Sequence, residues 1–260
     1  MKTCMHVRHQ GFSLVELMVA MALGLILVLN VLHPLLASKR GFVLQQHLAE
    51  VQENARFVLT RISRDLRQAG MFGCLDLQRL PAATRSQLPA DFAEPIIHVS
   101  GVLKLLSAVT AHNPVLTAEQ RNAAQYNAQW LLASDCLSDL RIASGSDNLA
   151  VSPGDVLIPV RQIEYRQAGQ KLQARINGAG NFETLIEGVA DFDVQFGLAT
   201  DVSERNVAGA YRNSIAATDA PLIRSVRIAL VLTDNPADPG AGFMRTQQYT
   251  LVTALRNRLD

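Results

Sequence analysis

Three kinds of side chain in this sequence could carry chemistry. They are three cysteines, six histidines, and a single acidic residue that stands inside a long apolar run. Cys4, Cys74 and Cys136 form no C-x-x-C motif, and the histidines are dispersed along the chain. A structural zinc site needs cysteine and histidine ligands at short, regular spacings. The pattern therefore predicts no metal site and no bound metal cofactor.

The common sequence motifs of catalytic sites are also missing. There is no G-x-S-x-G elbow, H-E-x-x-H helix, P-loop or dinucleotide fingerprint, which indicates a protein that is not an enzyme and needs no cofactor. A triad scattered along the chain would escape such a search. The formal net charge is +1 with no dense basic stretch, so nucleic-acid binding is not indicated. The oxygen-rich segment 234–240 could suggest calcium, but it lacks EF-hand spacing and is more typical of a turn-rich loop.

The acidic residue in the apolar run is Glu16. Residues 12–37 contain no Lys or Arg, whereas residues 1–11 carry Lys2 and Arg8. About 20 apolar residues span a bilayer as a helix, and the basic flank should stay cytoplasmic, which leaves the rest of the chain outside the cytoplasm. The run is too long for the apolar region of a secretory signal, so the candidate processing point precedes it, between Gly11 and Phe12.

The run Gly11-Phe12-Ser13-Leu14-Val15-Glu16-Leu17-Met18 resembles the type IV prepilin motif. The resemblance implies cleavage after Gly11, N-methylation of Phe12, and pairing of Glu16 with the terminal amine of a neighbouring subunit. A carboxylate at the bilayer centre costs roughly 2.5–3.5 kcal/mol and less near an interface, so Glu16 needs a partner or a function. The alternative is an interfacial acid in an uncleaved single-pass anchor.

Cleavage would remove Cys4 and leave Cys74 and Cys136. In an oxidising periplasm we expect these two to form a disulfide that ties the end of the helix to the head; the alternative is two buried free thiols. Later in the apolar run Pro34 predicts a helix kink, because proline removes one backbone hydrogen bond. That bend would serve filament packing or simply mark the exit from the membrane.

Beyond the apolar run, residues 38–70 show apolar positions spaced by three or four. This spacing predicts an amphipathic continuation of the helix that ends near Gly70 and turns its stripe toward a sheet. A coiled coil is the alternative, although the run is short for one. The stripe consists of Leu44, Leu48, Val51, Ala55, Val58, Ile62, Leu66 and Ala69.

The remainder, 71–260, is the expected periplasmic head. Its first part, 71–157, is broken by prolines, shows an Ala-rich helix candidate over 117–130, and has Trp130 as a core residue rather than a ligand platform. In 158–260 alternating residues predict an antiparallel sheet, with surface loops at 199–221 and 234–243. The strands are expected at 161–167, 171–176, 183–186, 192–198, 224–233 and 247–255. The predicted fold class is α+β and pilin-like, with a long N-terminal α-helix, its first half transmembrane, packed on an antiparallel β-sheet head.

Scattered pieces of the chain are similar to PilW-type minor pilins, including 66–74, 161–166, 185–197 and 254–258. The resemblance implies a structural minor pilin that primes type IV pilus assembly in a tip or initiation complex and supports adhesion, twitching motility or DNA uptake. Its partners would be other minor and major pilins, prepilin peptidase, the inner-membrane assembly platform and a tip adhesin. It would lie in the inner membrane as a single-pass protein, with the N-terminus cytoplasmic and the head periplasmic, and then in the pilus at the cell surface. The alternatives are a minor pseudopilin of type II secretion and a membrane-anchored periplasmic binding domain.

Overall fold

The computed structural model describes residues 13–77, 79–109, 117–137, 139–233 and 246–255. The chain divides into two compact units, residues 1–49 and residues 50–260, and each is described by itself. The processing residues Gly11 and Phe12 lie outside the described residues, as does the candidate calcium segment 234–240.

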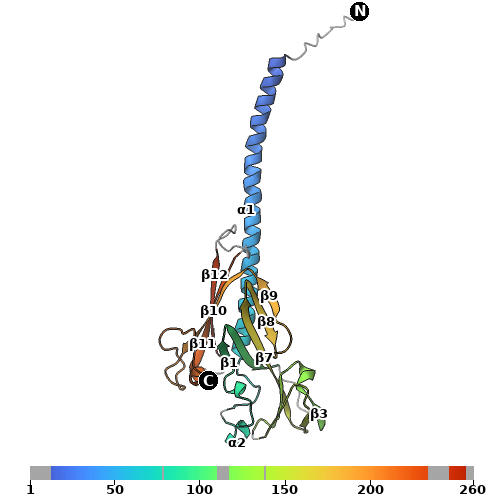
Figure 1. Ribbon diagram of the computed structural model, residues 1–260, viewed down its shortest axis with the longest axis vertical. Coiled ribbons are helices and arrows are strands. Elements are labelled where there is room, and N and C mark those ends of the chain that lie inside the picture. Colours follow the sequence, from blue (N-terminus) through green and yellow to red (C-terminus); the bar gives the residue numbers. More distant parts are fainter. Residues whose placement is uncertain (1–12, 78, 110–116, 138, 234–245, 256–260) are drawn as a thin grey trace, which may run out of the picture. The chain divides into compact units, whose positions relative to one another are not determined.

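One long helix, α1, runs from Leu14 to Gln68 (Figure 1). Its sequence contains only one proline, and its last turn carries Arg67, which complements the negative end of the helix dipole. Gly70 follows with a positive φ of 75°, and its N–H donates to the carbonyl of Leu106 on strand β2 (Val102–Ala108) at 2.8 Å. The predicted stop at Gly70 is confirmed. The positive φ at this position favours glycine, which has no Cβ to be strained there.

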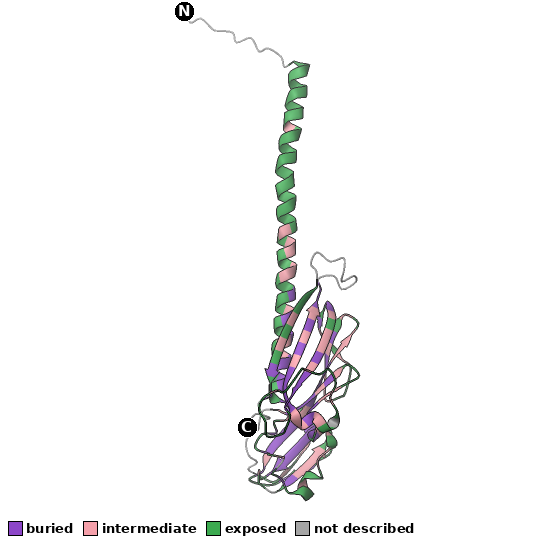
Figure 2. Ribbon diagram, turned by 90° about the vertical axis from the view of Figure 1, so that its left-hand side faces the viewer, coloured by how far each residue is buried: buried purple, intermediate pink, exposed green. Residues whose placement is uncertain are grey.

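In the second unit α1 buries the predicted stripe. Val51, Ala55, Val58, Ile62 and Leu66 are all at most 7% exposed. Figure 2 shows these buried positions interrupting the exposed surface of the helix where it meets the strands. Burial of this stripe against the sheets supplies the apolar contact that stabilises this part of the helix.

The larger sheet has seven antiparallel strands around β7 (Val156–Ala168), which is 13 residues long. One edge of β7 pairs with β2, and the other edge pairs first with β4 (Trp130–Ser134) and then with β8 (Lys171–Ile176). The outer strands of this sheet are β1 (Ile96–Val99), β5 (Leu140–Ser144) and β9 (Glu183–Glu187).

A second sheet places β11 (Ile223–Leu232) between β10 (Val189–Leu198) and β12 (Gln247–Ala254). The two sheets meet at Gly188, whose φ is 78° and whose N-terminal neighbour ends β9. A Cβ at this position would lie 2.5 Å from the carbonyl oxygen of Thr233, so the close approach of the two backbones requires glycine. A two-stranded ribbon of β3 (Glu119–Arg121) and β6 (Leu149–Val151) completes the strands.

The strands expected after residue 158 are confirmed, with β7 starting five residues earlier than predicted. The sheet is also larger than predicted, because β1, β2, β4 and β5 all come from the proline-rich region 71–157. Pro89 and Pro95 both come before β1 and not inside a strand, so they do not interrupt the strands of this region.

The helix predicted over 117–130 is wrong. Asn122 caps a single 3-10 turn, η2 (Ala123–Tyr126), with a capping box to Gln125, and Asn127 then adopts a left-handed φ of 50° that ends the turn. Trp130 is the first residue of β4 and pairs with Val160 of the central strand. Tertiary pairing overrides the local helix propensity of the alanines here. The other short helices are α2 (Ala82–Arg85), η1 (Ala90–Phe92) and η3 (Ala217–Leu222).

Trp130 is a core residue, as predicted. It is 6% exposed and meets the ring of Phe92 edge-on, with ring centroids 5.4 Å apart. Phe92 in turn lies against Phe72, just beyond the end of α1. The first part of the head therefore has its own aromatic core beside the central strand.

Candidate assembly site

The N-terminal end of α1 places Glu16 in its first turn. The Leu17 N–H donates to the carbonyl of Ser13 at 3.1 Å, which closes the first helical turn around this carboxylate. A negative charge at this position is favoured by the helix dipole, and the side chain is exposed, so it is free to accept a donor from another chain. Its pairing with an N-terminal amine stays a prediction.

The apolar residues of the first unit are exposed along the helix. Figure 2 shows an almost continuous exposed surface over this stretch. Within the described residues α1 is the helix long and apolar enough to cross a membrane. An exposed apolar surface of this extent needs a lipid or protein environment to cover it. Its large members include Leu14, Leu17, Met18, Met21, Leu25, Leu27, Val31 and Leu35.

Pro34 lies inside α1, and the helix continues on both sides of it. Proline has no N–H, so the carbonyl of Asn30, four residues earlier, loses its helical donor. The Asn30 side chain meanwhile donates to the carbonyl of Ile26 at 2.8 Å. The backbone of this turn is thus weakened by sequence, and the kink at Pro34 stays a prediction.

Two buried polar contacts fasten α1 to the sheets of the second unit. The Tyr165 hydroxyl of β7 donates to the carboxylate of Asp65, and both residues are buried. The Thr253 hydroxyl of β12 donates to Ser63 at 3.0 Å. Polar groups buried this deeply fix one orientation of the helix, because any rotation would leave them unpaired.

Burial raises the pKa of Tyr165 well above its ordinary value, and the negative charge of Asp65 and its hydrogen bond add to the shift. The positive charge of Arg61 acts in the opposite direction. The phenol therefore stays neutral and keeps donating its proton to Asp65 at physiological pH. The sequence contained a signal for this contact, because Asp65 is three residues after Ile62 and one before Leu66, on the buried stripe.

The structure joins Cys74 and Cys136 in a disulfide, with their Cα atoms 5.7 Å apart. Cys74 follows the end of α1 by six residues, and Cys136 lies in the turn between β4 and β5. The bond thus ties the end of the helix to the seven-stranded sheet, as expected from the processing that the prepilin motif implies.

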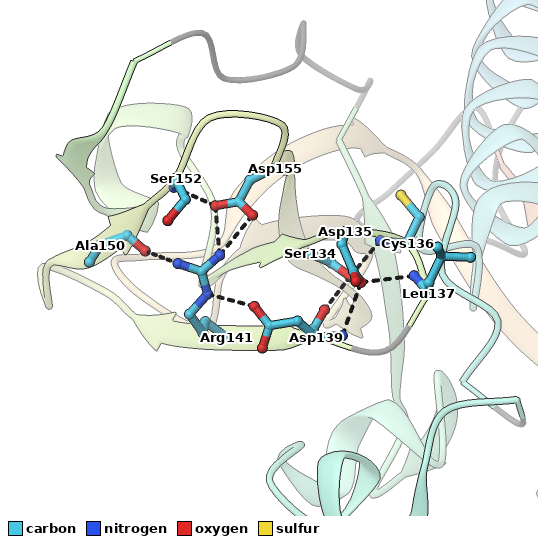
Figure 3. Close-up of polar contacts among 9 residues, drawn as sticks. All are labelled: Ser134, Asp135, Cys136, Leu137, Asp139, Arg141, Ala150, Ser152 and Asp155. Carbon is cyan, nitrogen blue, oxygen red and sulfur yellow. Dashed lines mark hydrogen bonds and ion pairs between the residues drawn. The ribbon is translucent and has the colours of Figure 1, made fainter.

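The turn that carries Cys136 is held by its own polar contacts (Figure 3). Cys136 has a φ of 65°, and its N–H donates to the Ser134 hydroxyl at 3.0 Å. The carboxylate of Asp135 accepts from the N–H groups of Leu137 and Asp139, both at 2.9 Å. Cys136 therefore lies in a turn that its own hydrogen bonds stabilise.

Beside that turn, Arg141 clamps three segments together (Figure 3). Its guanidinium donates to both carboxylate oxygens of Asp155 at 2.7 Å and to the carbonyl of Ala150 at 2.8 Å, and it pairs with Asp139 at 3.1 Å. Asp155 also accepts from the Ser152 N–H. A planar guanidinium suits these several acceptors, which lysine could not satisfy in the same way.

The predicted surface loop 199–221 is organised by a buried arginine that sequence reasoning missed. Arg224 of β11 is 3% exposed, and its guanidinium donates to backbone carbonyls of Asp201, Val202, Glu204, Pro221 and Ile223. Nothing in the alternation of β11 distinguished this arginine from an exposed one. The loop is therefore shaped from beneath by a strand residue that follows it.

The described residues hold no group of three or more His, Cys, Asp or Glu side chains that could bind a metal ion. The arrangements found are tethers between elements rather than a set of reacting groups. The candidate functional features within the described residues are the exposed apolar part of α1, the acid in its first turn, and the contacts that fix the head to the end of α1.

Comparison with known families finds two matches. Residues 7–29 match the model of the prokaryotic N-terminal methylation motif, and residues 162–257 match the model of type IV pilus-assembly protein W. No curated protein sequence matches the chain. Among solved structures, a type IV-like pilin from Thermus thermophilus aligns with 10% identity and a TM-score of 0.41, covering 80% of this chain and 97% of that one.

Proposed function

We propose that this chain, a member of the type IV pilin family with a PilW-type region over residues 162–257, is a minor pilin. In this proposal it primes pilus assembly. The chain is cut after Gly11, methylated at Phe12, and held in the inner membrane by residues 12–37 with its head in the periplasm. It then enters a pilus as part of a tip or initiation complex. The observation that carries this proposal is the methylation motif over residues 7–29, which extends into the exposed apolar part of α1.

The role is structural, and its mechanism depends on the two ends of α1. The apolar surface of the first unit is stable in lipid or against the helices of other pilins, because either environment removes it from water. The head travels with the helix because Asp65, Ser63 and the Cys74–Cys136 disulfide fasten the two together within the second unit. Adhesion, twitching motility or DNA uptake would follow from the filament that this complex initiates.

Glu16 is the proposed selector for incorporation. After cleavage the N-terminal amine of a neighbouring subunit is a cation that can enter the apolar layer only with a carboxylate partner. The partners proposed for the chain are other minor and major pilins, prepilin peptidase, the inner-membrane assembly platform and a tip adhesin, with the assembly ATPase supplied by another protein.

The first test is the intact mass and N-terminal sequence of the chain from cells with and without prepilin peptidase. We expect a methylated Phe12 terminus only when the peptidase is present. An intact Met1 terminus in both would favour the membrane-anchored binding domain.

The second test compares Glu16→Gln with Glu50→Gln, an exposed acid of the same helix beyond the apolar run. Both variants should be processed, and only Glu16→Gln should be lost from sheared pili. Normal piliation with Glu16→Gln would contradict the role of this carboxylate.

The methylation motif leaves a minor pseudopilin of type II secretion as the second candidate. Deletion of the gene separates the two, because loss of pilus display supports a minor pilin and loss of exoprotein release supports a pseudopilin. The match of residues 162–257 to the PilW model favours the pilus.

A further inference from the structure

A groove of about 860 Å³ lies within the second unit, between one side of α1 and strands β2, β7 and β8. Its walls carry four arginines, which we call the arginine groove: Arg56, Arg61 and Arg64 from α1, and Arg161 from β7. Two acids, Glu53 and Asp65, also line it. The groove therefore has an excess of positive charge.

The two acids are already engaged. Glu53 pairs with Arg56 at 2.8 Å, which lowers the pKa of its carboxyl through that hydrogen bond. Asp65 accepts the proton of the buried Tyr165 hydroxyl. None of the ion pairs formed within the described residues involves Arg64 or Arg161. Arg61 also forms no ion pair within the described residues, but its positive charge acts on the Tyr165 hydroxyl. Arg64 and Arg161 are therefore the guanidiniums of the groove that have neither an anion nor that hydroxyl as a partner among the described residues.

Arg161 gives a second and independent indication. Its Nε is buried, and among the described residues it has no hydrogen-bond partner. Buried donors in native proteins nearly always have an acceptor, and an unpaired one destabilises the fold. A ligand that brings acceptor oxygens to this edge of β7 would remove that cost.

The remaining lining indicates what kind of anion fits. Phe57 of α1 is 48% exposed, and Ile163 and Ile176 line the same groove from the sheet. A groove with apolar side chains, two internal acids and two unpaired guanidiniums suits a peptide with a carboxylate beside an apolar side chain. A densely charged phosphate polymer would meet Glu53 and Asp65 as well as the arginines, and would leave the apolar lining unused.

We propose that the arginine groove binds an acidic segment of a different pilin subunit, whose carboxylate accepts hydrogen bonds from Arg64 and Arg161. This proposal rests on the proposed function, in which α1 is the element that packs subunits together. Guanidinium groups form bidentate, directional contacts with carboxylates, so the contact would set the register between neighbouring heads as well as attract them.

The test uses the full-length chain in cells that assemble pili, with a photo-reactive benzoylphenylalanine in place of Gln68, an exposed residue of the groove wall. The adduct is identified by mass spectrometry. We expect a covalent product with another pilin, at a peptide that contains Asp or Glu.

The charge requirement is tested by adding Arg64→Gln and Arg161→Gln together. The matched control is Arg67→Gln, an exposed arginine of the same helix that does not line the groove. We expect the double variant to lower the yield of adduct at least about tenfold, because each charge-assisted contact is strong, and the control to change it less than about twofold. A charge swap gives a further check. Arg64→Glu alone should lower the yield of adduct, and replacement of the cross-linked acid of the partner pilin by lysine should restore that yield.

An adduct with a phospholipid or with a second copy of this chain would overturn the proposal. An unchanged yield of adduct in the double variant would also overturn it. So would the lack of any adduct. Processing at Gly11 and recovery in sheared pili are measured in the same cells: if both fail in the wild type, the proposed function is wrong, and if both are normal while the adduct ignores the arginines, only this inference is wrong. Formation of the Cys74–Cys136 disulfide in each variant reports that the head has folded.

Discussion

Replacement of Tyr165 by phenylalanine tests whether the head is fastened to α1 by a buried polar contact. The substitution removes one hydroxyl and keeps the ring, which is fully buried at 0% exposure. It leaves the carboxylate of Asp65, 7% exposed, without its donor. The free energy of unfolding should therefore fall even though no cavity is created.

The magnitude follows from the charge of the acceptor. A hydrogen bond to a charged group contributes about 1.5–3 kcal/mol, and a buried carboxylate left unpaired costs at the upper end of that range. Arg61, whose positive charge acts on the Tyr165 hydroxyl, would offset part of the loss. We expect Tyr165→Phe to cost about 2 kcal/mol. The matched neutral contact, removed by Thr253→Val, should cost about 1 kcal/mol or less.

The assay is urea unfolding of the full-length chain in detergent, followed by the fluorescence of Trp130, the single tryptophan of the chain. Measurement at alkaline pH adds an independent check. The pKa of Tyr165 is raised in the folded state, so its contribution is complete below the unfolded pKa of about 10 and is lost as pH rises from there toward the folded pKa.

The difference in stability between wild type and Tyr165→Phe should thus narrow above pH 10, by up to about 1.4 kcal/mol per pH unit for one proton. The reasoning is refuted if Tyr165→Phe costs less than Thr253→Val, or if the difference between the two proteins is the same at pH 8 and above pH 10.

Three further changes test the contacts that shape the head. Serine at both Cys74 and Cys136 should lower the free energy of unfolding, relative to the oxidised wild type, by about 4 kcal/mol on the loop-entropy estimate for their separation of 62 residues. Reduced wild type is the control and should be about as unstable as the serine variant. Gly188→Ala should lower the free energy of unfolding by more than the about 1–3 kcal/mol of a strained positive φ, because its Cβ would also meet the carbonyl of Thr233. The control is Gly209→Ala, which has a φ of 75° and open space around it and so measures the strain alone. Equal losses for the two variants would contradict the clash with Thr233. Arg224→Met should unpair the carbonyls of the loop 199–221 and cost at least about 2 kcal/mol, with rapid cleavage of that loop in limited proteolysis; an unchanged cleavage rate would show that the loop does not depend on the guanidinium.

The sequence by itself determined the features that follow from local pattern. The apolar run with one acid, the three-and-four spacing of the stripe from Val51 to Leu66, and the glycine at position 70 predict α1 and its end, because helical periodicity and the lack of a Cβ act over a few residues. Alternation beyond residue 158 likewise predicts the later strands. The cysteine count, combined with removal of the leader, was enough to expect the Cys74–Cys136 bond.

Only the tertiary structure decided how residues far apart share their polar groups. The segment 117–130 contains good helix formers, yet Trp130 becomes a strand residue because Val160 offers it a ladder partner. Asp65 lies on the predicted buried stripe, but its partner Tyr165 is brought to it only by the fold. Arg224 looks like a surface charge in a linear pattern, and its burial depends on four carbonyls of the preceding loop. Arg64 and Arg161 are 97 residues apart by number, and only the packing of α1 beside β7 makes them two walls of one groove. Periodicity reports which face of an element is buried, whereas the partner of a buried charge is set by long-range packing.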